Sequence, residues 1–230
     1  MLAMNNTALV TGGTGGLGSA TIATFLAAGW RVVAPARPGS IDRLPSGVVA
    51  VPADLGDPAG AAAAAAAAAG DPAAPLKAVI NLVGGYAGGG LIADTPVEEF
   101  EAMLTANLRP TYLTTAAALP HLVAAGGGSV VCVSSRAAVA PFPGAAGYVA
   151  AKAAVLAFAE TVAVEYRKQN VRCNTVLPSV IDTPANRLSM PDADHSRWVA
   201  PARIAETFLF LASDASAPTS GARIPVYGQA

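Results

Sequence analysis

Short β-branched runs alternate with longer alanine-rich stretches from one end of the chain to the other. The apolar runs are nearly continuous, which is typical of parallel strands whose two faces are both buried. The runs predict strands at 7–12, 31–36, 47–55, 77–84, 128–135, 171–178 and 222–228. The stretches between them predict helices at 16–28, 57–70, 96–124, 147–168 and 202–213.

Glycine, proline and aspartate mark where several of these helices begin and end. Gly29 is a suitable C-terminal cap for the first helix, and Asp57-Pro58 supplies an N-cap followed by a proline in the first turn. Pro110 and Pro120 are expected to bend the 96–124 helix or mark its ends. The segment 37–47 is too short for a crossover helix, so we expect a loop or one helical turn there.

Alternation of strand and helix predicts an α/β fold in which helices cover both faces of a parallel sheet. No linker-like segment interrupts the pattern, so we expect residues 1–230 to form a single domain. The poly-alanine run fits this arrangement, because alanine has the highest helix propensity and a small side chain lets a helix lie close to a sheet.

Composition narrows the class of protein. The 230 residues are 53% hydrophobic and 13% charged, with a net charge of −1, which excludes intrinsic disorder and argues against a nucleic-acid partner. Much of the apolar content is alanine, no run of strongly apolar residues is long enough to span a membrane, and the N-terminus lacks a signal-peptide pattern. Cys132 and Cys173 lie in apolar runs and are interpreted as buried free thiols, so we expect a cytoplasmic protein without a membrane partner.

A glycine-rich segment, TGGTGGLG at 11–18, joins the first strand to the first helix. Glycines permit a tight turn and close backbone approach, and the following helix N-terminus offers unpaired N–H groups to a pyrophosphate. The alternative is a plain strand-to-helix turn, but five glycines in residues 12–18 exceed what a turn needs. We therefore predict a dinucleotide loop, whose expected contacts are Gly12, Thr14, Gly16, Leu17 and Gly18.

The end of the second strand indicates which dinucleotide is bound. NAD enzymes usually place a carboxylate there for the ribose 2′-OH, whereas a cation suits a 2′-phosphate. This strand ends at Ala36-Arg37, so Arg37 is predicted to pair with a 2′-phosphate, and NADP(H) is favoured over NAD(H). A solvated loop arginine is the alternative.

Tyr148 and Lys152 are spaced so that they share one face of a helix. A nearby ammonium favours the phenolate, which would lower the tyrosine pKa and make Tyr148 usable as an acid or base. Ser134-Ser135 ends the fifth strand, and open α/β sheets bind ligands at the carboxyl ends of their strands. Together these residues form a candidate catalytic site.

With these motifs the chain resembles the classical short-chain dehydrogenase/reductases over essentially its whole length. The matching pieces also include Asp54-Leu55, Asn81-Leu82-Val83-Gly84, Asn107 and 177–183. The resemblance implies a Rossmann-type doubly wound sheet of seven parallel strands in the order 3-2-1-4-5-6-7. It implies that Tyr148 exchanges a proton with the substrate oxygen, Lys152 lowers the tyrosine pKa and holds the nicotinamide ribose, Ser135 polarises the carbonyl and Asn107 supports a proton relay. The cofactor contacts that it implies are Asp54, Leu55, Asn81, Gly84, Pro178, Ile181 and Thr183.

The sequence departs from the family pattern after the fourth and sixth strands. The family's usual Asn-Ala-Gly is replaced by Asn81-Leu82-Val83-Gly84-Gly85, and its usual Pro-Gly is replaced by Pro178-Ser179. Both replacements change the conformational freedom of the backbone near the expected nicotinamide position. Residues 84–89 and 177–198 resemble the dihydropteridine reductases. That branch favours NADH with an aspartate where this chain has Ala36, and it lacks the counterpart of Ser135.

The expected function is hydride transfer between NADP(H) and a small carbonyl or alcohol, with a dihydropteridine-type reductase and a non-catalytic NADP-sensing protein as alternatives. Tyr86, Asn186 and Arg187 are candidate substrate contacts, each of which has a surface-loop alternative. His121 and His195 have no partners at metal-ligand spacing, so no metal site is expected. Relatives suggest a homodimer or homotetramer that packs through the helix at 147–168.

Overall fold

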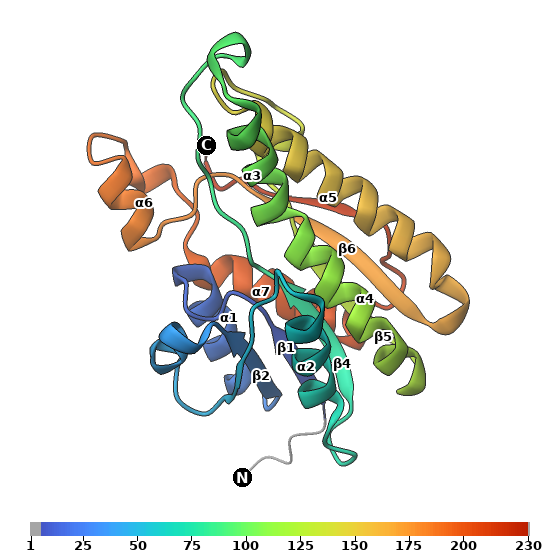
Figure 1. The fold of residues 1–230 in the computed structure, drawn as a ribbon. Helices are drawn as coiled ribbons and strands as arrows, with labels where there is room; N and C mark the ends of the chain where they lie inside the picture. The colour runs from blue at the N-terminus through green and yellow to red at the C-terminus, as the bar shows by residue number, and fades with distance from the viewer. Residues whose placement is uncertain (1–5, 230) are drawn as a thin grey trace.

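The computed structural model describes residues 6–229, and these form one seven-stranded parallel sheet covered by helices on both faces (Figure 1). The sheet order is β3-β2-β1-β4-β5-β6-β7, which confirms the predicted order. The strands are β1 Thr7–Val10, β2 Arg31–Ala36, β3 Val49–Pro52, β4 Leu76–Asn81, β5 Gly128–Val133, β6 Val171–Pro178 and β7 Arg223–Val226. The α-helices are α1 Gly16–Ala27, α2 Pro58–Ala69, α3 Val97–Asn107, α4 Arg109–Ala124, α5 Ala146–Glu165, α6 Pro184–Ser189 and α7 Pro201–Ala212.

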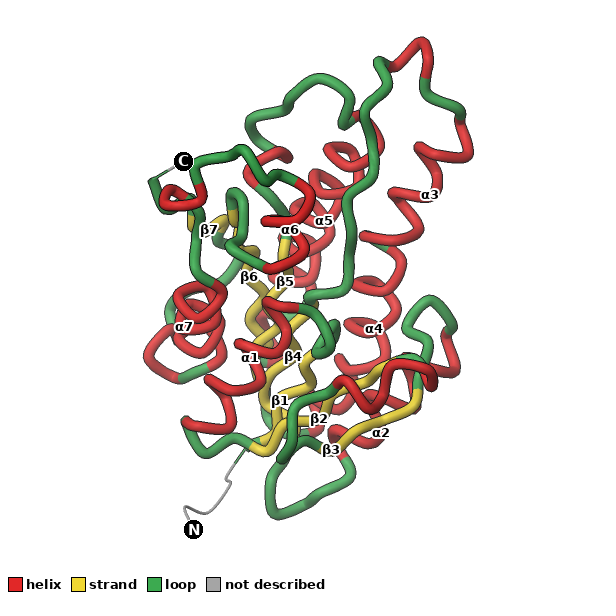
Figure 2. Tube along the Cα trace, turned by 90° about the vertical axis from the view of Figure 1, so that its left-hand side faces the viewer, coloured by secondary structure: helices red, strands yellow, loops and turns green. Residues whose placement is uncertain are grey.

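Two apolar layers hold the helices to the sheet. On one face α1 and α7 pack over β1, β2 and β4, with Phe25 and Phe208 fully buried. On the other face α2, α4 and α5 lie over the same sheet (Figure 2). Because both faces are covered, the strands must be apolar throughout, which explains the near-continuous runs in the sequence.

The alanine-rich helix α2 packs closely because its buried face is entirely alanine. Ala61, Ala64, Ala65 and Ala68 recur at helical spacing and are completely buried. The Asp57 carboxylate accepts a hydrogen bond from the Gly60 amide at 3.3 Å, so it caps the helix as predicted. The run is therefore an ordered crossover helix between β3 and β4.

The structure corrects the long helix expected at 96–124, which is two helices that meet at Leu108. Pro110 lies in the first turn of α4 and has no N–H to continue the hydrogen-bond ladder, so the break falls at this proline. Pro120 lies inside α4 and does not end it. The segment after β2 is one short 3₁₀ helix, Pro38–Arg43, which agrees with the expected single turn.

Other boundaries differ by a few residues. The first strand ends at Val10 rather than 12, because Gly12 turns the backbone to a φ of 68° and leaves the sheet. Helix α5 ends at Glu165 and a 3₁₀ turn follows it, whereas the sequence predicted one helix to 168. The stretch after β6, predicted to be irregular, contains the short helix α6.

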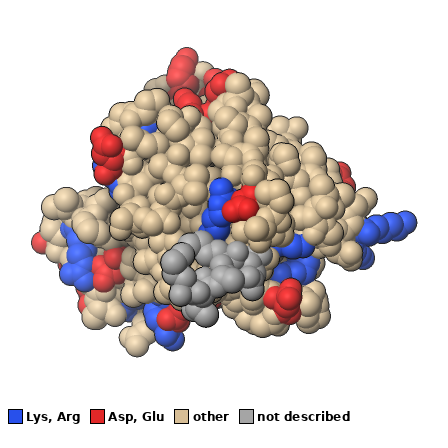
Figure 3. Space-filling view, turned by 90° about the horizontal axis from the view of Figure 1, so that it is seen from below, with Lys and Arg blue, Asp and Glu red and all other residues tan. Residues whose placement is uncertain are grey.

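The surface charges and the two cysteines lie as the sequence led us to expect. In Figure 3, basic and acidic side chains are interspersed singly over a surface that carries few charges. Cys132 and Cys173 are buried and unpaired, as predicted. Helix α5 is apolar and long enough to span a membrane by length and composition, but it packs on β6 and against α3 as part of this fold.

Candidate active site

A cavity of about 840 Å³ runs along the edge of the sheet where the parallel strands end. Its walls come from the segments that follow β1, β2, β3, β4, β5 and β6, together with the first turns of α1 and α5. In open α/β sheets this edge is where ligands bind. The strand order therefore brings together motifs that are far apart in the sequence.

The glycine loop forms one wall, and all five of its predicted contacts (Gly12, Thr14, Gly16, Leu17 and Gly18) line the cavity. A side chain at Gly18 would place its Cβ only 2.0 Å from the Gly12 carbonyl oxygen, so the turn requires glycine. No side chain caps the N-terminus of α1, which leaves its first amides free to bind an anion. The loop can therefore hold a pyrophosphate through backbone groups alone.

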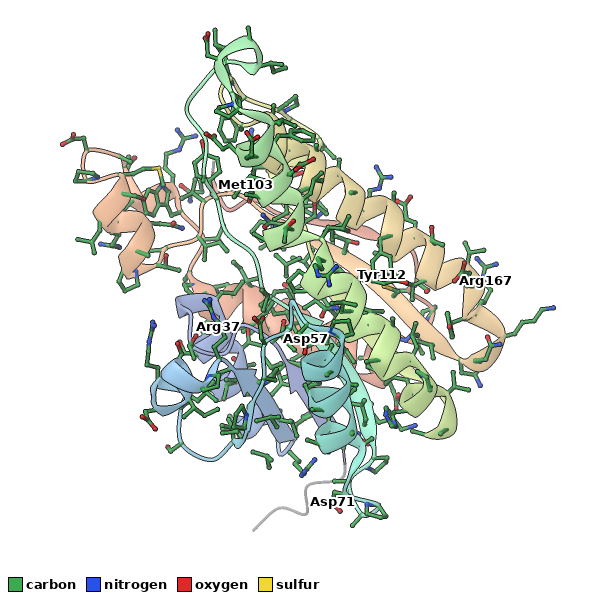
Figure 4. The ribbon with its side chains drawn as sticks, viewed as in Figure 1. Arg37, Asp57, Asp71, Met103, Tyr112 and Arg167 are labelled. Carbon is green, nitrogen blue, oxygen red and sulfur yellow. The ribbon has the colours of Figure 1, made fainter. Side chains whose placement is uncertain are left out.

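Cations gather where β2 ends. Arg37 lines the cavity there and is exposed (Figure 4), and Arg43 and Ser40 from the 3₁₀ turn line the same end. The sequence analysis did not identify Arg43. The short connection between β2 and β3 could have indicated Arg43, because a tight turn keeps its residues at the edge of the sheet. Asp54 and Leu55 line the cavity after β3, and the Asp54 carboxylate accepts the Gly56 amide at 2.9 Å.

At the other end of the cavity Tyr148, Lys152 and Ser135 come together. Lys152 is 6% exposed, its Nζ lies 5.8 Å from the centre of the Tyr148 ring, and it donates to the Val133 carbonyl at 3.1 Å. The Ser134 hydroxyl donates to the Lys152 carbonyl at 2.7 Å and so fixes α5 against the end of β5. Ser135, one residue further, lines the cavity beside Tyr148.

The protonation of this pair differs from the sequence expectation. Burial raises the pKa of the Tyr148 phenol, while the Ser135 hydroxyl lowers it as a hydrogen-bond partner and Tyr86 raises it. Burial also lowers the pKa of Lys152 to about 8, which nearby Cys132 opposes. The expected net lowering of the Tyr148 pKa is therefore wrong, because burial moves both groups toward their neutral forms.

Asn107 lies behind the cavity wall. Its Oδ1 accepts the Gly85 amide at 3.1 Å, and its Nδ2 donates to the carbonyls of Gly85 and Met103, both at 3.0 Å. A Cβ at Gly84 would lie 2.5 Å from the Asn107 Oδ1 and 3.1 Å from the Lys152 Nζ, so Gly84 is needed for this packing. The asparagine holds the loop after β4 against the C-terminal end of α3.

Three predicted contacts do not line the cavity. The Asn81 side chain is buried and donates to the Thr115 hydroxyl at 2.9 Å, because it faces α4 instead of the strand end. Thr183 caps α6 by accepting the Asn186 amide at 3.2 Å. Arg187 forms a two-point ion pair with Asp182, at 2.5 and 2.8 Å, which already neutralises its charge.

The remaining predicted contacts, Pro178, Ile181, Asn186 and Tyr86, do line the cavity, as does Gly84. Asn186 is held by a hydrogen bond from its Nδ2 to the Ile181 carbonyl at 2.8 Å. The Tyr86 ring stands edge-on to the Tyr148 ring, with centroids 5.2 Å apart and planes at 88°. This places the Tyr86 ring directly beside the Tyr148 ring.

These residues fit an extended dinucleotide. The cavity extends along the sheet edge from the end of β2 to the end of β5. These two strands are three positions apart in the sheet, so their ends are separated by roughly 14 Å at about 4.8 Å per strand. Backbone amides stand between a cationic end and a tyrosine end, which matches the adenosine, the pyrophosphate and the nicotinamide of a dinucleotide in that order.

Comparisons with known proteins agree with this geometry. The family model described as short chain dehydrogenase matches residues 6–194. A 2-(R)-hydroxypropyl-CoM dehydrogenase from Xanthobacter autotrophicus is 31% identical over 246 aligned positions, which cover 98% of each chain. A D-threitol dehydrogenase from Mycolicibacterium smegmatis is 30% identical, covering 96% of this chain and 91% of its own.

Among solved structures, one described as a short chain dehydrogenase/reductase family protein is 34% identical with a TM-score of 0.87, and the match covers 99% of this chain and 98% of that one. The family match spans the glycine loop, the Ser135–Tyr148–Lys152 cluster and the connection after β6. The chain belongs to the short-chain dehydrogenase/reductase family and is an NAD(P)-dependent oxidoreductase that acts on CH–OH or C=O groups.

Proposed function

We propose that the protein transfers hydride between NADP(H) and a small carbonyl or alcohol, with Tyr148 as the proton donor or acceptor. The observation that carries the proposal is the meeting of Tyr148, Ser135 and Lys152 at one end of a cavity whose far end holds two arginines. This arrangement gives acid–base chemistry and dinucleotide recognition a common site.

The protein's own groups define the proton path. When bound, the nicotinamide ring supplies or accepts the hydride. Ser135 and Tyr148 hold the substrate oxygen, and in the reduction direction Tyr148 gives its proton to that oxygen. The raised pKa of the Tyr148 phenol keeps it in the protonated form needed to donate near neutral pH. Asn107 acts through Gly85 and is a positioning residue.

The preference for NADP(H) rests on charge at the end of β2. Arg37 and Arg43 are exposed on the same cavity wall, and Ala36 stands where an acidic residue would exclude a 2′-phosphate. Guanidinium groups form forked, charge-assisted hydrogen bonds with phosphate oxygens. Two of them at one site favour the phosphorylated dinucleotide.

The cellular setting and assembly are part of the same proposal. We infer one catalytic domain over residues 1–230, in the reducing cytoplasm that suits two free thiols. A homodimer or homotetramer would pack through α5, on which Val164 is more than half exposed.

Replacing Tyr148 with phenylalanine tests the mechanism. We expect kcat for carbonyl reduction to fall at least roughly 100-fold, because general acid catalysis is removed, while NADPH binding is retained. Tyr166→Phe removes a hydroxyl from the C-terminal cap of the same helix and serves as the control. A Tyr148→Phe variant with near-normal kcat would refute the assigned role.

A further inference from the structure

An aromatic wall, defined here as Tyr86 and Phe142, borders the catalytic end of the cavity. Tyr86 lies in the loop after β4, and Phe142 lies between β5 and α5. The Tyr86 ring packs edge-on against Tyr148, and Phe142 lies behind it with ring centroids 6.1 Å apart. Tyr86 lines the cavity and is 55% exposed, so part of its ring is available to a ligand.

The two loops that carry the aromatic wall are fixed to one another. The Gly89 amide donates to the Gly144 carbonyl at 2.8 Å. A Cβ at Gly88 would lie 2.3 Å from that same carbonyl oxygen, so the loops approach too closely for any side chain there. The wall is therefore set in place before a substrate arrives.

The catalytic end of the cavity offers little to a charged substrate. The charged residues among those lining the cavity are Arg37, Arg43, Asp54 and Lys152. The first three follow β2 or lie before α2, at the edge of the sheet occupied by β2 and β3. Lys152 is buried beneath Tyr148 and engaged with the Val133 carbonyl.

Cations in the neighbouring segments already have partners. Arg136 lies over the Tyr227 ring at 5.2 Å, and Arg187 is paired with Asp182. Arg197 donates to the Gln229 carbonyl through two nitrogens, at 3.1 and 2.8 Å. A carboxylate or phosphate on the substrate would lose its water without gaining an unengaged cation in this part of the described chain.

We propose that the substrate is a neutral carbonyl compound, or the matching alcohol, that carries a flat apolar ring beside the reacting carbon. The ring packs on Tyr86, which Phe142 supports from behind, while the oxygen meets Tyr148 and Ser135. Aromatic pairs gain stabilisation beyond the area they bury, so this contact selects for a ring. This inference rests on the function proposed above.

The test compares three ketones with NADPH and the intact protein. Acetophenone carries a ring beside its carbonyl, para-acetylbenzoate is the same ketone with an added carboxylate, and butanone has no ring. We expect kcat/KM for acetophenone to exceed that for each of the other two at least roughly tenfold, since an unpaired charge or a lost ring contact costs more than about 1.4 kcal/mol.

Variants of Tyr86 then test whether the aromatic wall causes the preference for acetophenone over butanone. Tyr86→Ala should lower the ratio of kcat/KM for acetophenone to that for butanone about tenfold, and Tyr86→Phe, which keeps the ring, should restore most of it. Tyr112→Ala removes a tyrosine of similar exposure, 53%, from the outer face of α4 (Figure 4) and is the matched control.

The outcomes separate the two proposals. If butanone is used as well as acetophenone in a Tyr148-dependent reaction, the proposed function stands and the requirement for a ring is refuted. The same conclusion follows if Tyr86→Ala changes the ratio no more than Tyr112→Ala does. If para-acetylbenzoate is used as well as acetophenone, the proposed function stands and the requirement for a neutral substrate is refuted. If no ketone is turned over with NADPH or NADH, the proposed function fails and the inference fails with it.

Discussion

Replacing Lys152 with methionine measures how much the buried ammonium group in α5 lowers the free energy of unfolding. Lys152 is 6% exposed, and its Nζ has one hydrogen-bond partner, the Val133 carbonyl at 3.1 Å. Burial lowers its pKa from 10.5 to about 8. At about 1.4 kcal/mol per pH unit, holding this group charged in the folded protein costs roughly 3 kcal/mol.

The sign of the pH effect follows from proton counting. Below about pH 8 the folded and unfolded chains both carry the proton, so the full cost is present. Between about pH 8 and 10.5 the unfolded chain binds more protons at this lysine than the folded chain does. The contribution of Lys152 to the free energy of unfolding therefore rises with pH across this window.

Methionine keeps the length and apolar character of the side chain but cannot titrate. The free energy of unfolding of the wild type minus that of Lys152→Met should increase by roughly 2–3 kcal/mol from near pH 7 to near pH 10. The assay is urea denaturation of the cofactor-free protein at several pH values. Taking the difference between the two proteins removes the contributions of the other titrating groups.

Lys168→Met provides the matched control, since Lys168 is exposed in the turn after α5. Its difference from the wild type should vary by less than about 0.5 kcal/mol over the same range, as expected for an exposed charge. A Lys152→Met difference that is equally flat, or that falls as pH rises, would refute the assignment of the lowered pKa to burial.

Two further predictions concern cofactor binding. The double variant Arg37→Ala/Arg43→Ala should lower the ratio of kcat/KM for NADPH to that for NADH by roughly 10- to 100-fold, since each charge-assisted hydrogen bond contributes about 1.5–3 kcal/mol; an unchanged ratio in steady-state assays would contradict the assigned role. Gly18→Ala should weaken NADPH binding at least roughly tenfold and destabilise the fold by about 1–3 kcal/mol, because the new Cβ meets the Gly12 carbonyl. Fluorescence titration and thermal melting measure both effects, and Gly39→Ala is the control because a Cβ there has no neighbour within 4 Å; equal behaviour of the two glycine variants would count against a turn that only glycine can make.

The burial that lowers the pKa of Lys152 also links stability to catalysis. Burial shifts the pKa values of both Lys152 and Tyr148 toward their neutral forms, so the Tyr148 phenol carries the proton that its proposed acid role requires. This state suits carbonyl reduction, in which the substrate oxygen must receive a proton. Alcohol oxidation would require the phenol to ionise first and is expected to speed up at higher pH.

The sequence by itself predicted the architecture and indicated the candidate chemical groups of the site. Alternating apolar runs predicted the strands and crossover helices, because local hydrophobic periodicity and turn residues act over short distances. The resemblance to the short-chain dehydrogenase/reductases implied the sheet order, which the structure confirms. Gly12, Gly18, Tyr148 and Lys152 were found from spacing alone, since a glycine turn and a pair one helical turn apart are local patterns.

Only the tertiary structure decided which side chains face the cavity. Asn81 faces α4 and Arg187 is neutralised by Asp182, although both were predicted as direct contacts. Asn107, which was expected to support a proton relay, holds the Gly85 backbone. Arg43 reaches the cavity although no motif marked it. Orientation of a side chain depends on packing between segments that are distant in sequence, which local patterns do not encode.

The direction of the Tyr148 pKa has the same origin. From the sequence, Lys152 one helical turn away predicted a lowered pKa through its charge. The structure buries both groups, and their removal from water is the largest cause of both pKa shifts. Spacing along a helix specifies which groups are neighbours, but the depth at which they lie is set by the sheet and loops that cover them, and this depth decides their protonation.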